Sequence, residues 1–265
     1  MVRKWGLASL VILFAANSFA QVPALHEYTA LKTPGKITID GKLNEPGWKA
    51  APFTEPFVIY TNAAPPKFPT QCKLLWDEKN LYIAFVMTDR DVWARTRVFK
   101  EDIKDCLCRE EVAEIFIDPD GDGKQYLELE INPYGAVMDL KLASEILSKP
   151  ENIDMGWGYK GIQIGIGVNG TLNDSTDVDQ SWILEVALPF SNFAAPAPSM
   201  SIPPKQGDMW RINLYRYDYG RTAEKLTELT AWNMTDRNRG FHAPNRFGKV
   251  IFSDQTAGGK STGKK

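Results

Sequence analysis

Apolar and polar residues alternate with a period of two along most of this chain, a pattern typical of β-strands that bury one face. Turn signals rich in Gly, Pro, Asp and Asn separate the alternating runs, and the sequence has no long helical pattern or internal repeat. Many short strands joined in this way predict an all-β protein with long loops, either a β-sandwich or a barrel. About eleven strands are expected, at Lys36–Asp40, Gln71–Trp76, Leu81–Thr88, Val112–Asp118, Gln125–Asn132, Ala136–Leu140, Gly161–Val168, Trp182–Ala187, Trp210–Tyr217, Leu229–Trp232 and Phe247–Phe252.

Short helical pieces are expected at three places, Glu45–Ala50, Arg97–Lys104 and Ala143–Leu147. The Pro-rich stretches 63–69 and 194–204 are interpreted as surface loops rather than as linkers between domains. We therefore expect a single domain over residues 21–252.

The first 20 residues have the pattern of a secretory signal peptide. Arg3 and Lys4 precede an apolar run, and Ser18-Phe19-Ala20 offers small residues for cleavage before Gln21. The apolar run is shorter than the roughly 20 residues that cross a bilayer, so we expect export to the periplasm or the exterior and no membrane span. Residues 253–265 are polar and rich in Gly, Ser and Lys, and we expect a disordered tail there.

Composition narrows the classes of function. The chain has 265 residues, a formal net charge of −2, 8 Trp, 3 Cys and 2 His. A near-neutral balance argues against a nucleic-acid partner, which needs a clustered basic surface, and two His leave little room for a catalytic zinc site. Cys106 and Cys108 lie too close for an ordinary disulfide with each other, whereas Cys72 could pair with either of them.

The strands at 112–118 and 125–132 form a predicted hairpin whose register is fixed by its apolar residues. Ile115 then lies opposite Leu129, so that both apolar sets share one face. The other face collects three carboxylates and two rings, namely Glu114, Phe116, Tyr126, Glu128 and Glu130. Such a concentration of charge is repulsive unless a basic neighbour, a cation or a polyhydroxylated ligand neutralises it. An ordinary solvated face is the other interpretation, and both stay open.

A later strand has an almost bare face. Ile162, Ile164, Ile166 and Val168 alternate there with Gln163, Gly165 and Gly167. A glycine-lined face permits the close approach of another backbone or of a flat ligand, and tight packing within the sandwich is the simpler interpretation.

Asp118, Asp120 and Asp122 follow the D-x-D-x-D-G spacing by which calcium loops gather oxygen ligands. A helix–loop–helix calcium hand needs a Glu at position 12, which is Leu129 here, so that motif fails. Bound calcium and a plain hairpin turn rich in Asp and Gly remain the two interpretations.

An ordered set of motifs gives the chain a family resemblance. The set includes Ile39-Asp40-Gly41, Leu75-Trp76-Asp77, Glu114-Ile115-Phe116-Ile117-Asp118-Pro119, Trp210-Arg211-Ile212-Asn213 and Pro244-Asn245-Arg246-Phe247-Gly248. Over about residues 36–252 the chain resembles the family 9 carbohydrate-binding modules and their DOMON-like relatives. The resemblance implies an antiparallel β-sandwich of the jelly-roll, DOMON-like kind that binds sugars without catalysis, often with calcium. Our first hypothesis is therefore a carbohydrate-binding module that works alone or with exported polysaccharide-degrading partner proteins.

The resemblance also implies a sugar site. Two Trp rings sandwich a terminal sugar in sugar-binding members, and the matching positions here hold Cys108 and Phe241. Asp89 and Glu114 match polar contacts of the family, and Glu130 stands where sugar binders carry Arg. With Trp93 as a replacement ring and neighbours on the loop before the last strand, the expected set is Asp89, Trp93, Glu114, Glu130, Trp232, Asn238, Phe241 and His242.

The remaining Trp residues divide between core and loop. Trp48, Trp76, Trp182 and Trp210 have apolar strand contexts and are expected in the core. Trp157 lies in a Gly-rich aromatic loop, where a ligand platform and loop packing are both open.

Three other functions compete with a non-catalytic carbohydrate-binding protein. A glycoside hydrolase would use carboxylates among Glu111, Glu114, Glu128 and Glu130, so that any enzyme activity would be O-glycosyl hydrolysis. A haem-binding electron-transfer protein, which we expect less, would need His26, His242 or Met as axial ligands. The third is a sandwich that has lost its sugar site and acts as an interaction domain.

Overall fold

The computed structural model describes residues 23–97, 107–220, 225–235 and 238–259. Strands make up most of the regular structure in these ranges. They are β1 (Glu27–Lys32), β2 (Val58–Ile59), β3 (Thr70–Trp76), β4 (Asn80–Thr88), β5 (Val112–Asp118), β6 (Tyr126–Ile131), β7 (Val137–Leu142), β8 (Ile153–Asp154), β9 (Gln163–Asn169), β10 (Ser181–Pro189), β11 (Met209–Gly220), β12 (Lys225–Ala231) and β13 (Gly248–Thr256). Helix α1 (Pro46–Ala50) and the 3-10 turns η2 (Pro150–Asn152), η3 (Phe190–Phe193) and η5 (Pro244–Arg246) accompany them.

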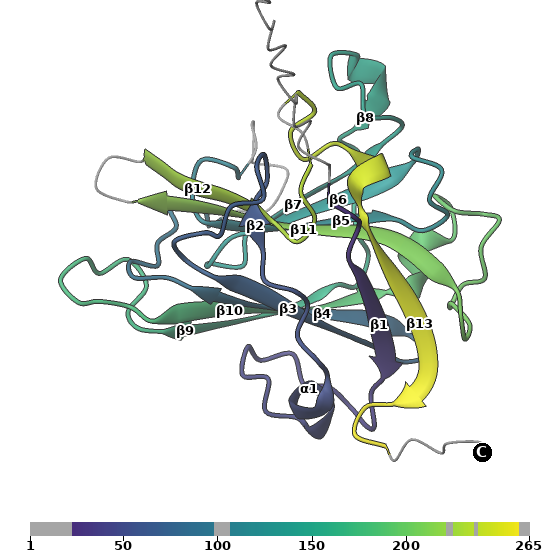
Figure 1. The fold of residues 1–265 in the computed structure, drawn as a ribbon, viewed down its shortest axis with the longest axis horizontal. Helices are drawn as coiled ribbons and strands as arrows, with labels where there is room; N and C mark the ends of the chain where they lie inside the picture. The colour runs from purple at the N-terminus through teal and green to yellow at the C-terminus, as the bar shows by residue number, and fades with distance from the viewer. Residues whose placement is uncertain (1–22, 98–106, 221–224, 236–237, 260–265) are drawn as a thin grey trace, which may run out of the picture.

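The strands form a rolled sheet that closes into two layers (Figure 1). One layer contains β8, β7, β6, β5, β11, β12 and β2, the other contains β3, β4, β10 and β9, and β13 with β1 runs along the side between them. The expected β-sandwich is therefore confirmed. Its sheet is mixed rather than wholly antiparallel, because β1 pairs in parallel with both β13 and β3.

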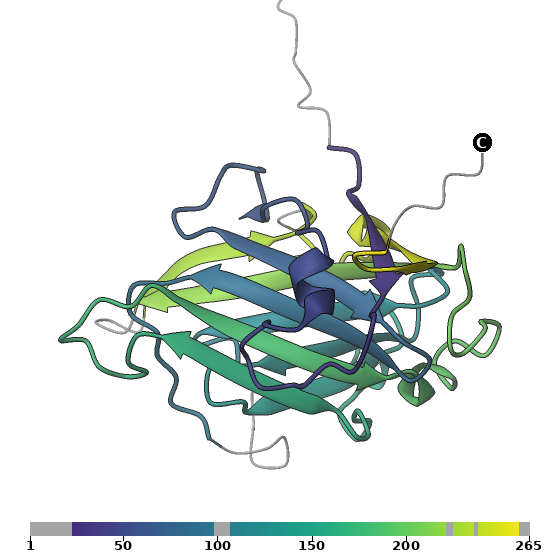
Figure 2. The ribbon, with the colours of Figure 1, turned by 90° about the horizontal axis from the view of Figure 1, so that it is seen from below.

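Alternation along the strands builds the main core between the layers. Ile83 and Phe85 of β4 face Ile115 and Ile117 of β5 within one apolar cluster. Three of the four Trp residues that we expected in the core, Trp76, Trp182 and Trp210, belong to this cluster. The fourth, Trp48, belongs to α1 and is buried with Leu75 and Tyr82 in a smaller apolar cluster. Helix α1 packs on the outer face of the second layer (Figure 2).

Strands β5 and β6 are buried on both faces. The predicted register is confirmed, with Ile115 opposite Leu129 and Glu114 opposite Glu130. The inner face joins the main core, while the outer face lies under a second apolar cluster that includes Phe241 and Phe247. This covered outer face is the part of the fold that positions the site described below.

The bare face of β9 receives another backbone. A Cβ atom on Gly165 would lie 2.6 Å from the backbone nitrogen of Gly41, and one on Gly167 would lie 2.3 Å from its carbonyl oxygen. The turn at Gly41 is held by Glu185, whose carboxylate accepts hydrogen bonds from the Asp40 and Gly41 amides at 3.0 and 2.9 Å. The same carboxylate accepts the Trp48 indole N–H at 2.7 Å. The strand predicted at Lys36–Asp40 is therefore wrong. The Glu185 carboxylate accepts hydrogen bonds from backbone amides that would pair with a neighbouring strand in a sheet.

Other local predictions also differ from the structure. Ala143–Leu147 is not a helix but part of a looped crossing that leads to β8. The short strands β1, β2 and β8 were not expected, since each depends on a partner distant in sequence or is only two residues long. β13 continues to Thr256, beyond the expected start of the tail, because it stays paired with β1. Residues 98–104 of the helix expected at Arg97–Lys104, and the signal pattern at 1–20, lie outside the described residues.

No helix in the described ranges combines the length and the apolar character that a bilayer crossing requires.

The close contact on β9 gives a test of the fold. We expect Gly165→Ala to lower the free energy of unfolding by about 1–3 kcal/mol, because the new methyl group has to displace the backbone of residues 40–41. Chemical denaturation measures this change. Gly35→Ala is the matched control, since a Cβ atom there meets nothing within 4 Å and the variant should match the parent. Equal losses in the two variants would contradict the close packing.

Candidate functional site

A cavity of about 840 Å³ opens on the outer face of the first layer, and we call it the carboxyl pocket. Its acidic groups are Glu114 of β5 together with Glu128 and Glu130 of β6. Its other described lining residues are mostly apolar or aromatic, namely Cys108, Met138, Leu140, Leu142, Leu147, Pro150, Ile153, Met155, Tyr217, Gly240, Phe241 and His242. Strand β7 and the crossing 147–155 supply the aliphatic wall, and residues 240–242 supply another part.

The three glutamates lie together because the hairpin register places them on one face. Glu114 is the direct cross-strand neighbour of Glu130, and Glu128 precedes Glu130 by two residues on the same face. Their exposed fractions are only 2%, 5% and 3% for Glu114, Glu128 and Glu130. The interpretation of this face as an ordinary solvated surface is therefore wrong.

Burial and mutual repulsion raise the pKa values of these carboxyl groups. The pKa of Glu114 is well above its usual range, first because of burial and then because of the charges of Glu130 and Glu128. The pKa of Glu128 is also well above its usual range, for the same reasons and because its side chain hydrogen-bonds Glu130. Glu130 in turn accepts the backbone N–H of Leu107 at 2.7 Å. The cluster thus favours states in which carboxyl groups keep protons.

Phe241 is the best-connected ring of the pocket. Its ring is stacked on Tyr215 with centroids 4.0 Å apart and planes inclined by 13°. Tyr60 and Tyr217 meet it edge to face at 5.2 and 5.3 Å. These contacts hold the ring in one orientation, as a stacking surface requires.

His242 lines the pocket beside the carboxyl groups in its neutral form. Its Nδ1 atom lies 3.1 Å from the Tyr126 hydroxyl, and its Nε2 atom lies 4.0 Å from Glu128 Oε2. Burial lowers the pKa of His242 to about 4, so the ring does not neutralise the carboxylates at pH 7.

Cys108 lines the pocket at the position where the family resemblance called for a Trp. Cys108 is disulfide-bonded, whereas Cys72 is a free thiol buried in the main core. The interpretation that made Cys72 the available disulfide partner is therefore wrong, and Cys106 lies outside the described residues.

Four of the eight predicted sugar-site residues line the carboxyl pocket, namely Glu114, Glu130, Phe241 and His242. The structure places the other four outside its lining. The indole N–H groups of Trp93 and Trp232 are used internally, on the Tyr219 carbonyl at 2.7 Å and on Glu55 Oε2 at 3.1 Å. Asn238 is an exposed loop residue.

Asp89, the fourth of these, belongs to a buried ion cluster. The Arg216 guanidinium donates to its carboxylate at 2.6 Å and lies 3.4 Å from Glu111 and 3.6 Å from Asp218. Glu111, which the hydrolase interpretation counted among its carboxylates, also accepts the Tyr219 N–H at 2.6 Å. Both residues are therefore tied to Arg216 and are absent from the described lining of the pocket.

Sequence reasoning missed the aliphatic wall of the site. Met138, Leu140 and Leu142 of β7 face the pocket, while Val137 of the same strand faces the main core. Apolar residues on both faces of a strand are a signal of double burial, and this signal could have shown that the acidic face is covered.

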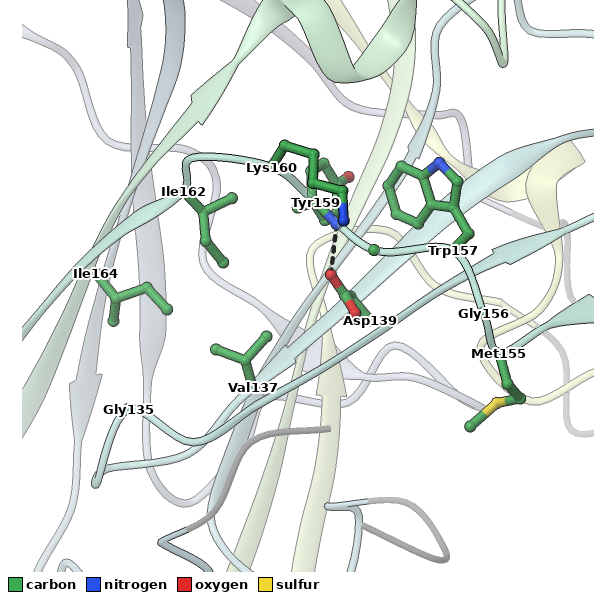
Figure 3. Close-up of a pocket in the computed structure, with 11 residues that line it drawn as sticks. Gly135, Val137, Asp139, Met155, Gly156, Trp157, Tyr159, Lys160, Ile162 and Ile164 are labelled. Atoms are coloured by element: carbon green, nitrogen blue, oxygen red, sulfur yellow. Dashed lines mark hydrogen bonds between the residues drawn. The ribbon is translucent and has the colours of Figure 1, made fainter. Parts of the chain in front are cut away.

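A second cavity of about 870 Å³, which we call the edge cavity, lies between β7 of the first layer and β9 of the second. Figure 3 shows Val137, Ile162 and Ile164 on one side of it and Trp157 on the other. Its acidic group, Asp139, already has a hydrogen-bond partner within the protein, because it accepts the Tyr159 N–H at 2.6 Å. The Trp157 ring packs edge to face on Tyr159 at 4.7 Å, which is the loop-packing interpretation. The carboxyl pocket therefore offers the richer chemistry.

The acidic turn between β5 and β6 brings its three aspartates together. One carboxylate oxygen from each of Asp118, Asp120 and Asp122 lies within 4.8 Å of the others. Buried Asp118 also accepts the amides of Gly121 and Gly123 at 3.0 and 2.9 Å, and burial raises its pKa to about 7. Oxygen ligands of this kind suit calcium, so the residues fit the predicted ion.

Comparisons with known proteins agree with this fold. Two solved structures of a family 9 carbohydrate-binding module from Caldicellulosiruptor kristjanssonii, one with cellotriose and one with glucose, match with TM-scores of 0.57 and 0.54 at 14% identity. The matches cover 90% and 86% of this chain and 98% and 96% of those chains. A candidate carbohydrate-binding protein from Bacteroides uniformis ATCC 8492 matches with a TM-score of 0.58 at 16% identity, over 87% of this chain and 100% of that one.

A search of curated proteins finds no match to this sequence. The model of the family described as "Carbohydrate family 9 binding domain-like" matches residues 39–255, which include the strands of both layers and every residue of the carboxyl pocket. The chain belongs to this carbohydrate-binding family, as its sequence motifs predicted.

Proposed function

We propose that this protein binds a carbohydrate in the carboxyl pocket without transforming it. The observation that carries the proposal is a cavity in which buried carboxyl groups meet a fixed aromatic ring and an aliphatic wall. Sugars likewise combine apolar and polar surfaces. Their C–H faces pack on apolar surfaces, and their hydroxyl groups need hydrogen-bond partners. The cellotriose and glucose complexes of family 9 modules support a saccharide ligand.

Each side chain has a role in this proposal. The C–H face of a pyranose lies on Phe241 and on the aliphatic side chains of β7. Glu114, Glu128 and Glu130 accept hydrogen bonds from hydroxyl groups, and a carboxyl group that keeps its proton also donates one. His242 is held by Tyr126, and its Nε2 atom lies 4.0 Å from Glu128 Oε2.

The burial of the carboxyl groups supports binding as the function. Buried carboxyl groups without a compensating cation are unfavourable, and folded proteins keep such groups mainly where they act. Hydroxyl groups of a ligand supply hydrogen bonds to these carboxyl groups. The ligand therefore offsets part of the free-energy cost of burying these carboxyl groups in the folded protein.

The proposal also includes the cellular location in which the protein acts. The signal-like pattern of residues 1–20 supports export to the periplasm or the exterior. There the protein would hold a polysaccharide or its fragments and support their breakdown by polysaccharide-degrading partner proteins. Calcium at Asp118, Asp120 and Asp122 would fix the turn that joins the two strands carrying the glutamates.

Binding should depend on the ring of Phe241. We expect Phe241→Leu to weaken cellotriose binding at least fivefold, on the order of 1 kcal/mol, because the apolar volume stays while the stacking face is lost. Isothermal titration calorimetry measures the affinity. Phe53→Leu is the control, since Phe53 is an exposed ring outside the pocket.

Two outcomes would contradict this proposal. An unchanged affinity in Phe241→Leu would place the sugar elsewhere, for example in the edge cavity. Release of reducing sugar from the oligosaccharide, abolished by Glu114→Gln, would show hydrolysis instead of simple binding.

The ligand-free protein should lose stability as the pH rises. The pKa of Glu114 and of Glu128 is higher in the folded state than the 4.5 of a free side chain, so the folded state binds more protons above that pH. Each such carboxyl group then lowers the free energy of unfolding by up to about 1.4 kcal/mol per pH unit until it ionises in the folded state. Denaturation curves between about pH 5 and pH 8 should show a smaller decline for Glu114→Gln than for the parent. Parallel declines would argue against the shifted pKa.

Calcium should stabilise the turn between β5 and β6. We expect excess calcium to raise the midpoint of thermal unfolding, and Asp120→Asn to remove most of that increase, because the carboxylate is one of three oxygen donors there. Differential scanning calorimetry with calcium and with a chelator measures the effect. Identical midpoints in the two solutions would overturn the calcium site.

A further inference from the structure

The hydrogen-bonding groups of the carboxyl pocket are strongly unbalanced toward acceptors. None of the described residues that line it is Lys, Arg, Asn or Gln. The lining side chains with polar hydrogen are Tyr217, His242 and whichever glutamates keep their protons. A ligand rich in donors therefore fits this pocket better than one rich in acceptors.

Glu114 has no hydrogen bond or ion pair with any other described residue. It is 98% buried, with its side chain on the pocket wall. Apart from burial, the influences on its pKa are the charges of Glu130 and Glu128, and no donor among the described residues offsets them. Among the described residues, Glu128 has another carboxyl group, Glu130, as its hydrogen-bond partner. Both groups are thus held beside like charges inside a largely apolar wall.

Positive charge has a favourable place beside aromatic rings as well as beside carboxylates. The rings of Phe241 and Tyr217 lie on the same pocket, and a ring face attracts a cation by its quadrupole. An ammonium group has three N–H donors and one positive charge, so it can donate hydrogen bonds to several carboxyl oxygens at once. A hydroxyl group has one donor and no charge.

We propose that the carboxyl pocket selects a sugar with a free ammonium group, a hexosamine unit, over neutral and anionic sugars. This inference rests on the proposed function, since it names the class of sugar that the same pocket takes. A uronic acid would bring a fourth carboxylate to the cluster and is rejected. An N-acetylated unit keeps the shape but loses the charge, and it is bound no better than a neutral sugar.

Ammonium binding has a signature that neutral-sugar binding lacks. The charge of the ligand favours ionisation of the surrounding carboxyl groups, so protons leave Glu114 or the Glu128–Glu130 pair when the ligand enters. Proton release makes the measured heat of binding depend on the ionisation enthalpy of the buffer. Cellotriose, which has the same ring and linkage without the amine, provides the matched neutral ligand.

The test is calorimetry of the whole protein with β-1,4-linked glucosamine trimer, its N-acetylated form, cellotriose and glucuronic acid, at about pH 6, where the amine is charged. We expect the glucosamine trimer to bind roughly tenfold more tightly than cellotriose, with proton release. Glu114→Gln should bring the two affinities within about threefold of each other, and Glu128→Gln is the second variant should the first not fold. Glu151→Gln is the control, because Glu151 is an exposed carboxylate beside the lining residue Pro150 but outside the lining itself.

The outcomes separate this inference from the proposed function. Equal binding of cellotriose and the glucosamine trimer, or binding without proton release, overturns the ammonium preference and leaves carbohydrate binding intact. Failure of every saccharide overturns both. Loss of glucosamine binding in excess calcium, with calcium bound by the same glutamates, would assign the cluster to a metal ion and also overturn the inference.

Discussion

Strands β5 and β6 have to be shielded from water on both faces, and much of the molecule is arranged to meet that constraint. The inner face carries Ile115, Ile117 and Leu129, which the second layer covers. The outer face carries acidic and aromatic side chains, which only chain segments beyond the sandwich can cover. The crossing at 147–155 and the segment 240–247 provide that cover, and the gap left between them is the carboxyl pocket. Fold and site thus arise from one requirement.

The protein treats buried negative charge in two different ways. At Arg216 one guanidinium lies among three carboxylates, and backbone N–H groups help to satisfy them. In the carboxyl pocket no described lining residue has a permanent positive charge, and the glutamates respond by keeping protons. The first cluster holds its cation within the fold, although Arg216 Nε and Asp218 Oδ2 have no hydrogen-bond partner among the described residues. The second has no such cation among its described lining residues, and in the proposed function a ligand supplies its hydrogen-bond partners.

The sequence allowed the strands with clear alternation to be located, and even the register of the β5–β6 hairpin, because a shift of one residue would have turned Ile115 out of the core. It did not allow β1 to be located, since that strand depends on β13, more than 200 residues away. The same distinction holds for the site. Four of the predicted sugar-site residues, Glu114, Glu130, Phe241 and His242, line the carboxyl pocket. Asp89 was not a pocket residue, because its pairing with Arg216 is a long-range contact that no local pattern reveals.

The Trp residues illustrate why composition alone points to fold before function. Trp76, Trp182 and Trp210 fill the core between the layers, and Trp93 and Trp232 are fixed by hydrogen bonds to other parts of the fold. The pocket instead relies on Phe241 and Tyr217 for aromatic surface, and on aliphatic side chains of β7 for the rest. In the proposed function, stacking on a sugar would be one-sided, because a disulfide-bonded Cys108 stands in place of a second large ring. Recognition would then come more from the carboxyl groups than from aromatic area, and a carboxyl-dominated pocket discriminates between ligands chiefly by their donors and their charge.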